Sequence, residues 1–233
     1  MAGGARASDV LRSIRGLAVP SRLEGMARFG IETRTALGVT VTELRGLARG
    51  LGRDHELAAD LWACGIHEAR ILASIVDDPA AVTEEQMETW LRGFDSWDLC
   101  DQACGNLFDR TPFAFDKALE WSVREPEFEK RAGFALMATS AVHRRDWPDR
   151  DFHVFLPRIR AEATDERNYV KKAVSWALRQ IGKRSAELHA RALRTAREIE
   201  AIDARSARWI AGDVLRELES PAARRRLARS AGR

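Results

Sequence analysis

A tryptophan and an aspartate stand one helical turn apart in FDSWDLCDQACGNLF, residues 94–108. Apolar residues at helical spacing predict that this stretch is a helix, and the spacing puts Trp97 and Asp101 on the same face. A fixed carboxylate can stabilise positive charge that develops during a reaction, or it can orient a water molecule for attack. The face of an indole attracts cationic groups. The pair is therefore a candidate for chemistry that passes through a positively charged state.

A purely structural explanation of the same spacing is a core tryptophan whose indole N–H is accepted by a neighbouring acid. Asp95 and Asp98 are expected to be cap and surface residues, because an acid near a helix N-terminus stabilises the helix dipole. We expect four further tryptophans to pack in the interior: Trp62, Trp90, Trp121 and Trp209.

Other kinds of site have weaker support in the sequence. Cys100 and Cys104 lie one turn apart without a second pair, which disfavours a zinc site. His67 and Glu68 lack the second histidine of the HExxH pattern. A phosphate-binding glycine loop of the GxxxxGK type is also missing. We therefore expect no metal and no organic cofactor.

The composition fits a globular protein with a substantial core. The chain has 233 residues, of which 45% are hydrophobic, enough for one large domain or two small ones. It has no apolar run of membrane-spanning length, and its N-terminus lacks the apolar stretch of a signal peptide. Three cysteines do not suggest a disulfide framework. These features predict a cytoplasmic protein that has no membrane partner.

The charges are unevenly distributed along the chain. From Arg158 onward there are 19 Lys and Arg against 10 Asp and Glu, a net charge of +9, whereas residues 1–157 carry −6. A basic second half is typical of proteins that bind a polyanion such as nucleic acid. Solvated helix faces followed by a basic tail would give the same distribution, so charge alone leaves both interpretations open.

The spacing of apolar residues predicts an all-α protein. Apolar residues recur at intervals of three and four throughout, and the seven prolines fall mostly near expected turns. Four helical segments share a basic residue that leads into a run of small residues: HEARILASIV, EKRAGFALMA, VKKAVSWALR and SARWIAGDVL.

These four segments also recur at regular intervals. Aligned on Arg70, Arg131, Lys172 and Arg208, they are 61, 41 and 36 residues apart, and the first interval has room for an extra helix pair around Trp97. Helix pairs that recur about every 40 residues are typical of HEAT-type repeats, which stack into a solenoid with a concave inner surface. We predict at least four stacked pairs with these helices on the inner surface. An irregular helical bundle is the alternative.

The order of these motifs resembles that of the AlkC/AlkD-type DNA alkylation repair proteins, which are HEAT-like-repeat DNA glycosylases. The resemblance runs from about Arg28 to Leu218. It begins with Gly-Ile, Gly-Val, a Leu-Arg helix and a Leu-Trp helix in ARFGIETRTALGVTVTELRGLARGLGRDHELAADLW. IHEARILA, FDSWDLCD, the helix around Arg131 and VKKAVSWALRQIG follow in the family's order.

The resemblance implies a function and a set of site residues. It implies that the chain hydrolyses the N-glycosidic bond of N3- or N7-alkylated purines in double-stranded DNA. The family's catalytic residues correspond to Asp101, Trp97, Arg131 and Trp176, and Arg131 would hold a phosphate. The expected DNA-binding residues are Arg131, Lys171, Lys172, Arg179 and Arg208.

Two other functions remain open at this stage. One is a relative that binds unusual or damaged DNA structures without catalysis, and the other is a HEAT-type scaffold for a protein partner. We expect the chain to be a monomer with a single domain over residues 1–218 and a disordered basic tail over residues 219–233.

Overall fold

The computed structural model describes residues 6–223 and 225 of the chain. All regular secondary structure in these residues is helical, without a strand, which confirms the prediction of an all-α protein. Backbone contacts divide the chain into two compact units, Met1–Thr111 and Pro112–Arg233. A single domain over residues 1–218 stays a prediction. Most of the predicted disordered tail, residues 224 and 226–233, lies outside the described residues, whereas residues 221–223 are helical.

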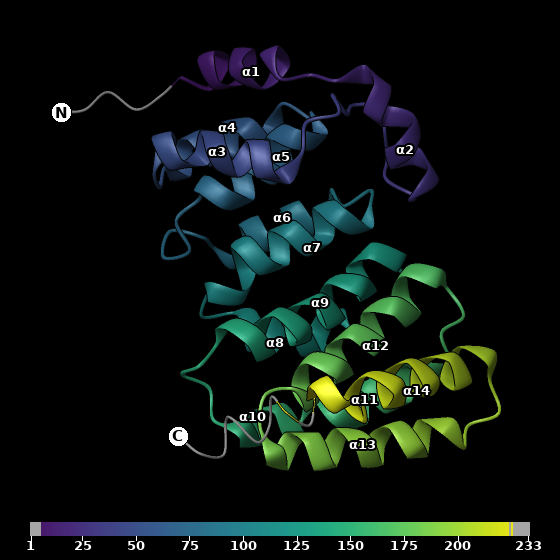
Figure 1. The fold of residues 1–233 in the computed structure, drawn as a ribbon. Coiled ribbons are helices and arrows are strands. Elements are labelled where there is room, and N and C mark those ends of the chain that lie inside the picture. Colours follow the sequence, from purple (N-terminus) through teal and green to yellow (C-terminus); the bar gives the residue numbers. More distant parts are fainter. Residues whose placement is uncertain (1–5, 224, 226–233) are drawn as a thin grey trace. The chain divides into compact units, whose positions relative to one another are not determined.

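The first unit consists of short helices, drawn from purple to teal in Figure 1. Its elements are α1 (Ala7–Gly16), η1 (Pro20–Arg22), α2 (Leu23–Arg28), α3 (Val41–Leu51), α4 (His55–Ala63), α5 (His67–Val76), α6 (Glu84–Arg92), α7 (Trp97–Asn106) and η2 (Phe108–Arg110).

Local caps explain where two of these helices begin. At the start of α3, the Thr40 hydroxyl accepts from the Glu43 N–H at 3.3 Å, and the Glu43 carboxylate accepts from the Thr40 N–H at 2.7 Å. This reciprocal capping box satisfies two donors that a helix leaves open at its N-terminus. At the start of α4, the Asp54 carboxylate accepts from the Leu57 N–H at 2.9 Å.

The helices of the first unit pack in two series. Helices α3, α5 and α7 contact one another in succession, and α4 packs on α5. Trp62 on α4 and Trp90 on α6 stack in parallel with their ring centroids 4.1 Å apart, and both are buried as predicted. Contacts between equivalent helices of successive pairs are the arrangement expected of a helical repeat.

The second unit contains longer helices, drawn from teal to yellow in Figure 1. Its elements are α8 (Ala114–Trp121), α9 (Glu127–His143), α10 (Asp149–His153), α11 (Phe155–Ala161), η3 (Glu162–Thr164), α12 (Asn168–Gly182), α13 (Ala186–Glu200) and α14 (Arg205–Leu218). Pro126 and Pro148 stand directly before α9 and α10, as expected of prolines that mark helix starts.

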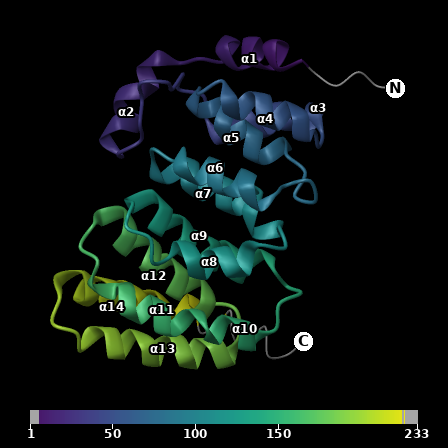
Figure 2. The same cartoon turned by 180° about the vertical axis from the view of Figure 1, so that it is seen from behind.

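The anchors of the predicted repeat lie on helices that pack in order. Arg131, Lys172 and Arg208 belong to α9, α12 and α14, and α12 contacts both of the others in agreement with Figures 1 and 2. Arg70 belongs to α5, which lies between α3 and α7 in the first unit. A common inner surface for all four helices stays a prediction.

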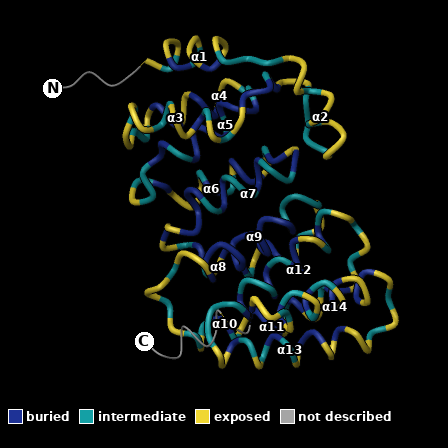
Figure 3. Tube along the Cα trace, in the orientation of Figure 1, coloured by how far each residue is buried: buried dark blue, intermediate teal, exposed yellow. Residues whose placement is uncertain are grey.

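Helix α9 forms the centre of the second unit. Every residue from Lys130 to Ala141 is buried, and Figure 3 shows most of this helix in dark blue. Its small residues let α8 and α12 approach closely. Gly133 is the tightest of these contacts, because a Cβ atom there would lie 2.3 Å from the backbone nitrogen of Ser122.

We therefore expect Gly133→Ala to destabilise the protein by about 1–3 kcal/mol, since the added methyl group would push α8 away from α9. The matched control is Gly212→Ala on the exposed side of α14, where an added Cβ meets nothing within 4 Å. That change should stabilise the helix by up to about 1 kcal/mol. Urea unfolding measures both, and equal effects would contradict the packing argument.

Candidate functional site

Helix α7 presents a half-buried stripe that contains both Trp97 and Asp101. The opposite side of the helix is buried at Leu99, Cys100, Ala103 and Cys104, which fixes the direction of the stripe. Trp97, Asp98, Asp101, Gln102 and Gly105 are only partly buried. Since residues four apart share a helix face, the indole of Trp97 and the carboxylate of Asp101 are neighbours on this stripe.

The indole of Trp97 is anchored by the backbone of another element. Its Nε1–H donates to the carbonyl oxygen of Phe29, directly after α2, at 2.9 Å. The structural alternative, in which a neighbouring acid accepts this proton, is therefore wrong about the acceptor. This hydrogen bond holds the indole in one orientation.

Asp98 differs from the prediction that it is a surface residue. Its carboxylate accepts from the Ser96 hydroxyl at 2.8 Å and lies 2.9 Å from Nε2 of the buried His67, and its side chain is only 14% exposed. Asp98 does lie in the first turn of α7, as a residue that favours the helix dipole should. The partner from α5 could not be recognised because it is 31 residues away in the sequence.

This pair shifts the pKa values of both groups. Burial lowers the pKa of His67, but the hydrogen bond and the charge of Asp98 outweigh it, so the pKa of His67 is raised above its ordinary value. Burial raises the pKa of Asp98, but the hydrogen bond from His67 outweighs it, so the pKa of Asp98 is lowered. Both charged forms are therefore favoured in the folded protein.

The stabilisation by this pair should depend on pH. A histidine whose pKa is raised in the folded state stabilises the fold at pH values below its unfolded pKa. This stabilisation is lost as the pH rises through the folded pKa. A carboxyl group whose pKa is lowered in the folded state stabilises the fold at pH values above its unfolded pKa. This stabilisation is lost as the pH falls through the folded pKa. The pair therefore contributes most between about pH 4 and pH 6.5, the ordinary values of the two groups.

We expect Asp98→Asn to cost about 1–3 kcal/mol in the free energy of unfolding near pH 5.5, because a buried donor loses a charged acceptor. The cost should be smaller at pH 8.5, because the contribution of the ion pair declines as pH rises through the folded pKa of His67. Urea unfolding at the two pH values measures the difference. Asp95→Asn is the control, because Asp95 is exposed. A loss independent of pH would contradict the ion pair.

The cysteines of α7 are part of the core. Cys100 and Cys104 are both fully buried. Burial raises the pKa of the Cys104 thiol well above its ordinary value, and the nearby charge of Asp101 adds to the rise. The described part of the chain contains no group of three or more His, Cys, Asp or Glu side chains arranged to hold a metal ion.

Arg131 and Trp176 belong to the second unit, on the packed helices α9 and α12. Arg131 is only 5% exposed, and its Nη1 donates to the carbonyl oxygen of Tyr169 at 2.6 Å. Trp176 is partly buried. Its indole N–H donates to the Gln180 side-chain oxygen at 3.1 Å in the amide orientation that satisfies both groups. Trp97 and Asp101 lie on one helix of the first unit, whereas Arg131 and Trp176 lie on two packed helices of the second.

The predicted DNA-binding residues of the second unit differ in their partners. Lys172 is exposed, and the ammonium of Lys171 lies 5.4 Å from the centroid of the Trp209 ring. Arg179 forms ion pairs with Glu217 and, at 3.3 Å, with Asp213. Arg208 pairs with Asp203 at 2.8 Å, but this pair is exposed to solvent. Arg179 is thus already neutralised, whereas the two lysines are better suited to meet a phosphate.

The prediction that Trp209 packs in the interior is wrong. Trp209 on α14 is 40% exposed, whereas Trp62, Trp90 and Trp121 are buried. The helical spacing gives α14 a buried face at Ala207, Ile210, Ala211 and Val214, and Trp209 falls outside it. Its ring covers part of the surface beside Lys171.

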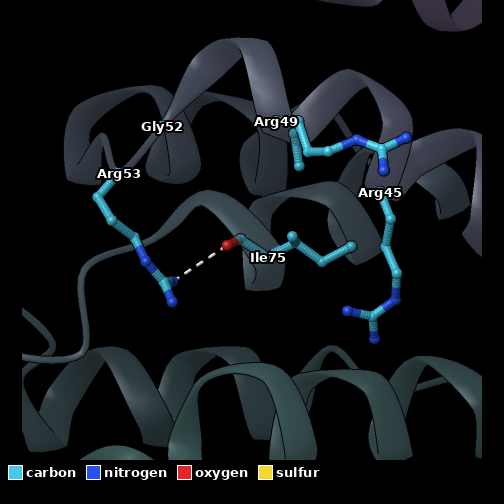
Figure 4. A pocket seen from close by; sticks show the side chains of 6 residues that line it. Arg45, Arg49, Gly52, Arg53 and Ile75 are labelled. Atoms are coloured by element: carbon cyan, nitrogen blue, oxygen red, sulfur yellow. Dashed lines mark hydrogen bonds between the residues drawn. The ribbon is translucent and has the colours of Figure 1, made fainter.

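A cluster of arginines in the first unit was not predicted from the sequence. Arg45 and Arg49 on α3 and Arg53 beyond its end line a pocket of about 420 Å³, whose other walls are Ala48, Gly52 and Ile75 (Figure 4). The sequence signal was present, because the arginines follow one another at intervals of four residues in LRGLARGLGRD. The net charge of −6 over residues 1–157 conceals this local group of cations.

The successive helix pairs make this chain a helical-repeat protein. The carboxylate on α7 gives it a candidate site for a reaction that passes through a cationic centre. A family model described as "DNA alkylation repair enzyme" matches residues 10–219. The chain therefore belongs to this family, which confirms the resemblance seen in its motifs.

The fold is shared with a solved structure from a study described as "A new family of proteins related to the HEAT-like repeat DNA glycosylases with affinity for branched DNA structures". The TM-score is 0.77 at 19% sequence identity, and the match covers 91% of this chain and 95% of that chain. This confirms a HEAT-like repeat fold over an irregular bundle. No curated protein matches the sequence of the chain. In the described residues, no helix is both long and apolar enough to cross a membrane.

Proposed function

We propose that the chain is a DNA glycosylase that hydrolyses the N-glycosidic bond of N3- or N7-alkylated purines in duplex DNA. The observation that carries the proposal is the stripe of α7, where an anchored indole and a half-buried carboxylate are neighbours in a member of the DNA alkylation repair family. Incubation with duplex DNA that carries N7-methylguanine, followed by alkaline cleavage, tests it. Strand breaks at the lesion are expected.

The chemistry needs a group with the properties of Asp101. Alkylation at N3 or N7 puts positive charge on the purine, which weakens the glycosidic bond. Departure of the base leaves an oxocarbenium-like sugar, which a fixed carboxylate stabilises electrostatically. The same carboxylate can orient a water molecule for attack at C1′. This reaction requires no metal and no organic cofactor, because the carboxylate and water supply the groups that react.

The other predicted residues have positioning roles in this proposal. The indoles of Trp97 and Trp176 would flank the sugar and phosphate of the lesion. An aromatic face there would attract the positive charge that develops on the sugar by about 0.5–2 kcal/mol. Arg131 would bind a phosphate through its planar guanidinium. Its hydrogen bond to the Tyr169 carbonyl holds that group in one orientation before DNA binds. The alkylated purine, the monomeric state and the cytoplasmic location are parts of this proposal.

Binding to DNA should depend steeply on salt, because each neutralised phosphate releases counterions. We expect Lys171→Ala combined with Lys172→Ala to flatten the slope of log K against log salt by up to about two. Fluorescence anisotropy with labelled duplex DNA measures this slope. The matched control removes two charges from α13, with Arg191→Ala and Arg194→Ala. An equal slope in the lysine variant and the wild type would place the contact elsewhere, and a protein scaffold would bind no DNA at any salt.

A second candidate function is recognition of branched DNA without excision. It is favoured by the structural relative, whose description gives affinity for branched DNA structures. In that case the chain should bind a four-way junction more tightly than a linear duplex and should release no base from alkylated DNA. The intact set of Trp97, Asp101, Arg131 and Trp176 favours the glycosylase.

A further inference from the structure

The arginine pocket of the first unit, lined by Arg45, Arg49 and Arg53, is an open concave site of about 420 Å³. In Figure 4 the side chains of Arg45 and Arg53 extend toward the helices below, with Ile75 between them. Helix α3 supplies Arg45 and Arg49 one turn apart, and α5 supplies Ile75. The pocket therefore belongs to the packed series of α3, α5 and α7.

None of these three arginines has a carboxylate partner among the described residues. Arg45 donates to the side-chain oxygens of Asn106 at 2.8 Å and Gln102 at 3.4 Å, and both acceptors are neutral amides. Arg53 donates to backbone carbonyls, including that of Ile75 at 3.0 Å. Arg49 is exposed, and it forms neither a hydrogen bond nor an ion pair within the described part of the chain. The pocket thus carries a positive charge that local acids do not neutralise.

Two exposed glycines lie beside the arginines on α3. Gly46 and Gly50 follow Arg45 and Arg49 directly and are exposed on α3, and a Cβ at Gly50 would meet nothing within 4 Å. Glycine in an exposed helix interior is less stable than alanine, so helix stability does not explain these residues. Absence of side chains lets the backbone of a bulky partner come close to the guanidinium groups.

We propose that this pocket binds the phosphodiester backbone of DNA. Guanidinium groups bind two phosphate oxygens at once, and several arginines at one concave site suit a strand with a regular phosphate spacing. The position within the fold favours DNA over other anions. Arg45 rests on Gln102 and Asn106 of α7, and Gln102 follows Asp101 directly. A strand held here would pass beside the candidate catalytic carboxylate.

This inference rests on the proposed DNA-binding function and adds a contact in the half of the chain whose net charge is −6. The test uses Arg49→Gln, which breaks no interaction within the described residues, and the double variant Arg45→Gln/Arg49→Gln. Arg92→Gln is the matched control, because Arg92 is an exposed arginine on α6 that lies outside the pocket. Thermal unfolding of each variant checks that the fold is kept.

The expected result is measured with labelled duplex DNA at a series of salt concentrations. Arg49→Gln should weaken binding about tenfold at moderate salt and flatten the slope of log K against log salt by about 0.9, whereas the double variant should flatten it by about 1.8. Arg92→Gln should leave the slope unchanged. If the wild type binds DNA and the double variant has the same slope, the proposed contact at the pocket is wrong, but the proposed function is not affected. A wild type that binds no DNA would overturn the proposed function and this contact with it.

Discussion

Asp101→Asn should lower the rate of excision of N7-methylguanine by about 10²–10³ at saturating protein. The change keeps the shape of the side chain and removes its charge, so the oxocarbenium-like sugar loses one fixed electrostatic contact. Affinity for undamaged DNA should stay equal or rise, because a negative charge is removed from the surface that faces phosphate. Single-turnover excision and equilibrium binding, measured side by side, separate the two effects.

The matched control for this variant is Asp95→Asn. Asp95 is an exposed carboxylate just before α7 and lies 3.7 Å from Arg70 in a pair that is also partly exposed. Its replacement should leave excision within about twofold, since surface substitutions usually change little. Full excision by Asp101→Asn, or an equal loss in both variants, would refute the role assigned to Asp101.

Trp97→Ala should lower the excision rate by up to about thirtyfold, whereas Trp97→Phe should retain most of the activity. A cation–π contact contributes about 0.5–2 kcal/mol, and phenylalanine keeps the aromatic face while it loses the N–H that binds the Phe29 carbonyl. Trp176→Ala should have a similar effect if its indole also faces the lesion. Single-turnover excision by each variant measures these changes.

Stability distinguishes this role from a core role. A core tryptophan should lose about 3–5 kcal/mol of unfolding free energy when replaced by alanine, whereas the half-buried Trp97 and Trp176 should lose less. Trp121→Ala is the control for a core role, because that ring is fully buried and has no place in the proposed site. If Trp97→Ala excised at the wild-type rate and only unfolded more easily, the indole would be structural.

The fold could be predicted because its signals are local. Apolar spacing defines each helix, prolines stand before α9 and α10, and Thr40 with Glu43 forms a capping box that uses only neighbouring residues. The recurrence of a basic residue before small residues also identified α9, α12 and α14, which pack in order. The division of backbone contacts at Thr111 left no trace in the composition.

The site was predicted less completely, because side-chain partners far apart in the sequence decide its electrostatics. Asp98 meets His67 from another helix pair, and Arg179 is neutralised by Glu217 and Asp213, which lie on α14. Helical spacing also cannot tell a tryptophan inside the buried arc from one at its edge, so Trp209 was misplaced. The motif that carries Trp97 and Asp101 was recognisable since both residues lie on one helix.

The arginine pocket was not predicted because net charge was summed over a long segment. Net charge over a long segment is a sum, and 25 acidic residues in residues 1–157 conceal a local group of cations. In the described residues, Arg45 and Arg53 donate to neutral acceptors and Arg49 has no hydrogen-bond partner. Local charge at a surface, and not the balance of a segment, decides where a polyanion binds.

Cleavage of the glycosidic bond is tested most directly by measuring the release of the free base. Purified protein in excess over duplex DNA with a single N7-methylguanine is incubated, and the released base is separated by chromatography and quantified over time. The proposed glycosylase activity predicts one equivalent of free N7-methylguanine per lesion, at a rate well above spontaneous depurination and strongly reduced in Asp101→Asn. Release at the spontaneous rate by a wild-type protein that binds the same DNA would contradict it.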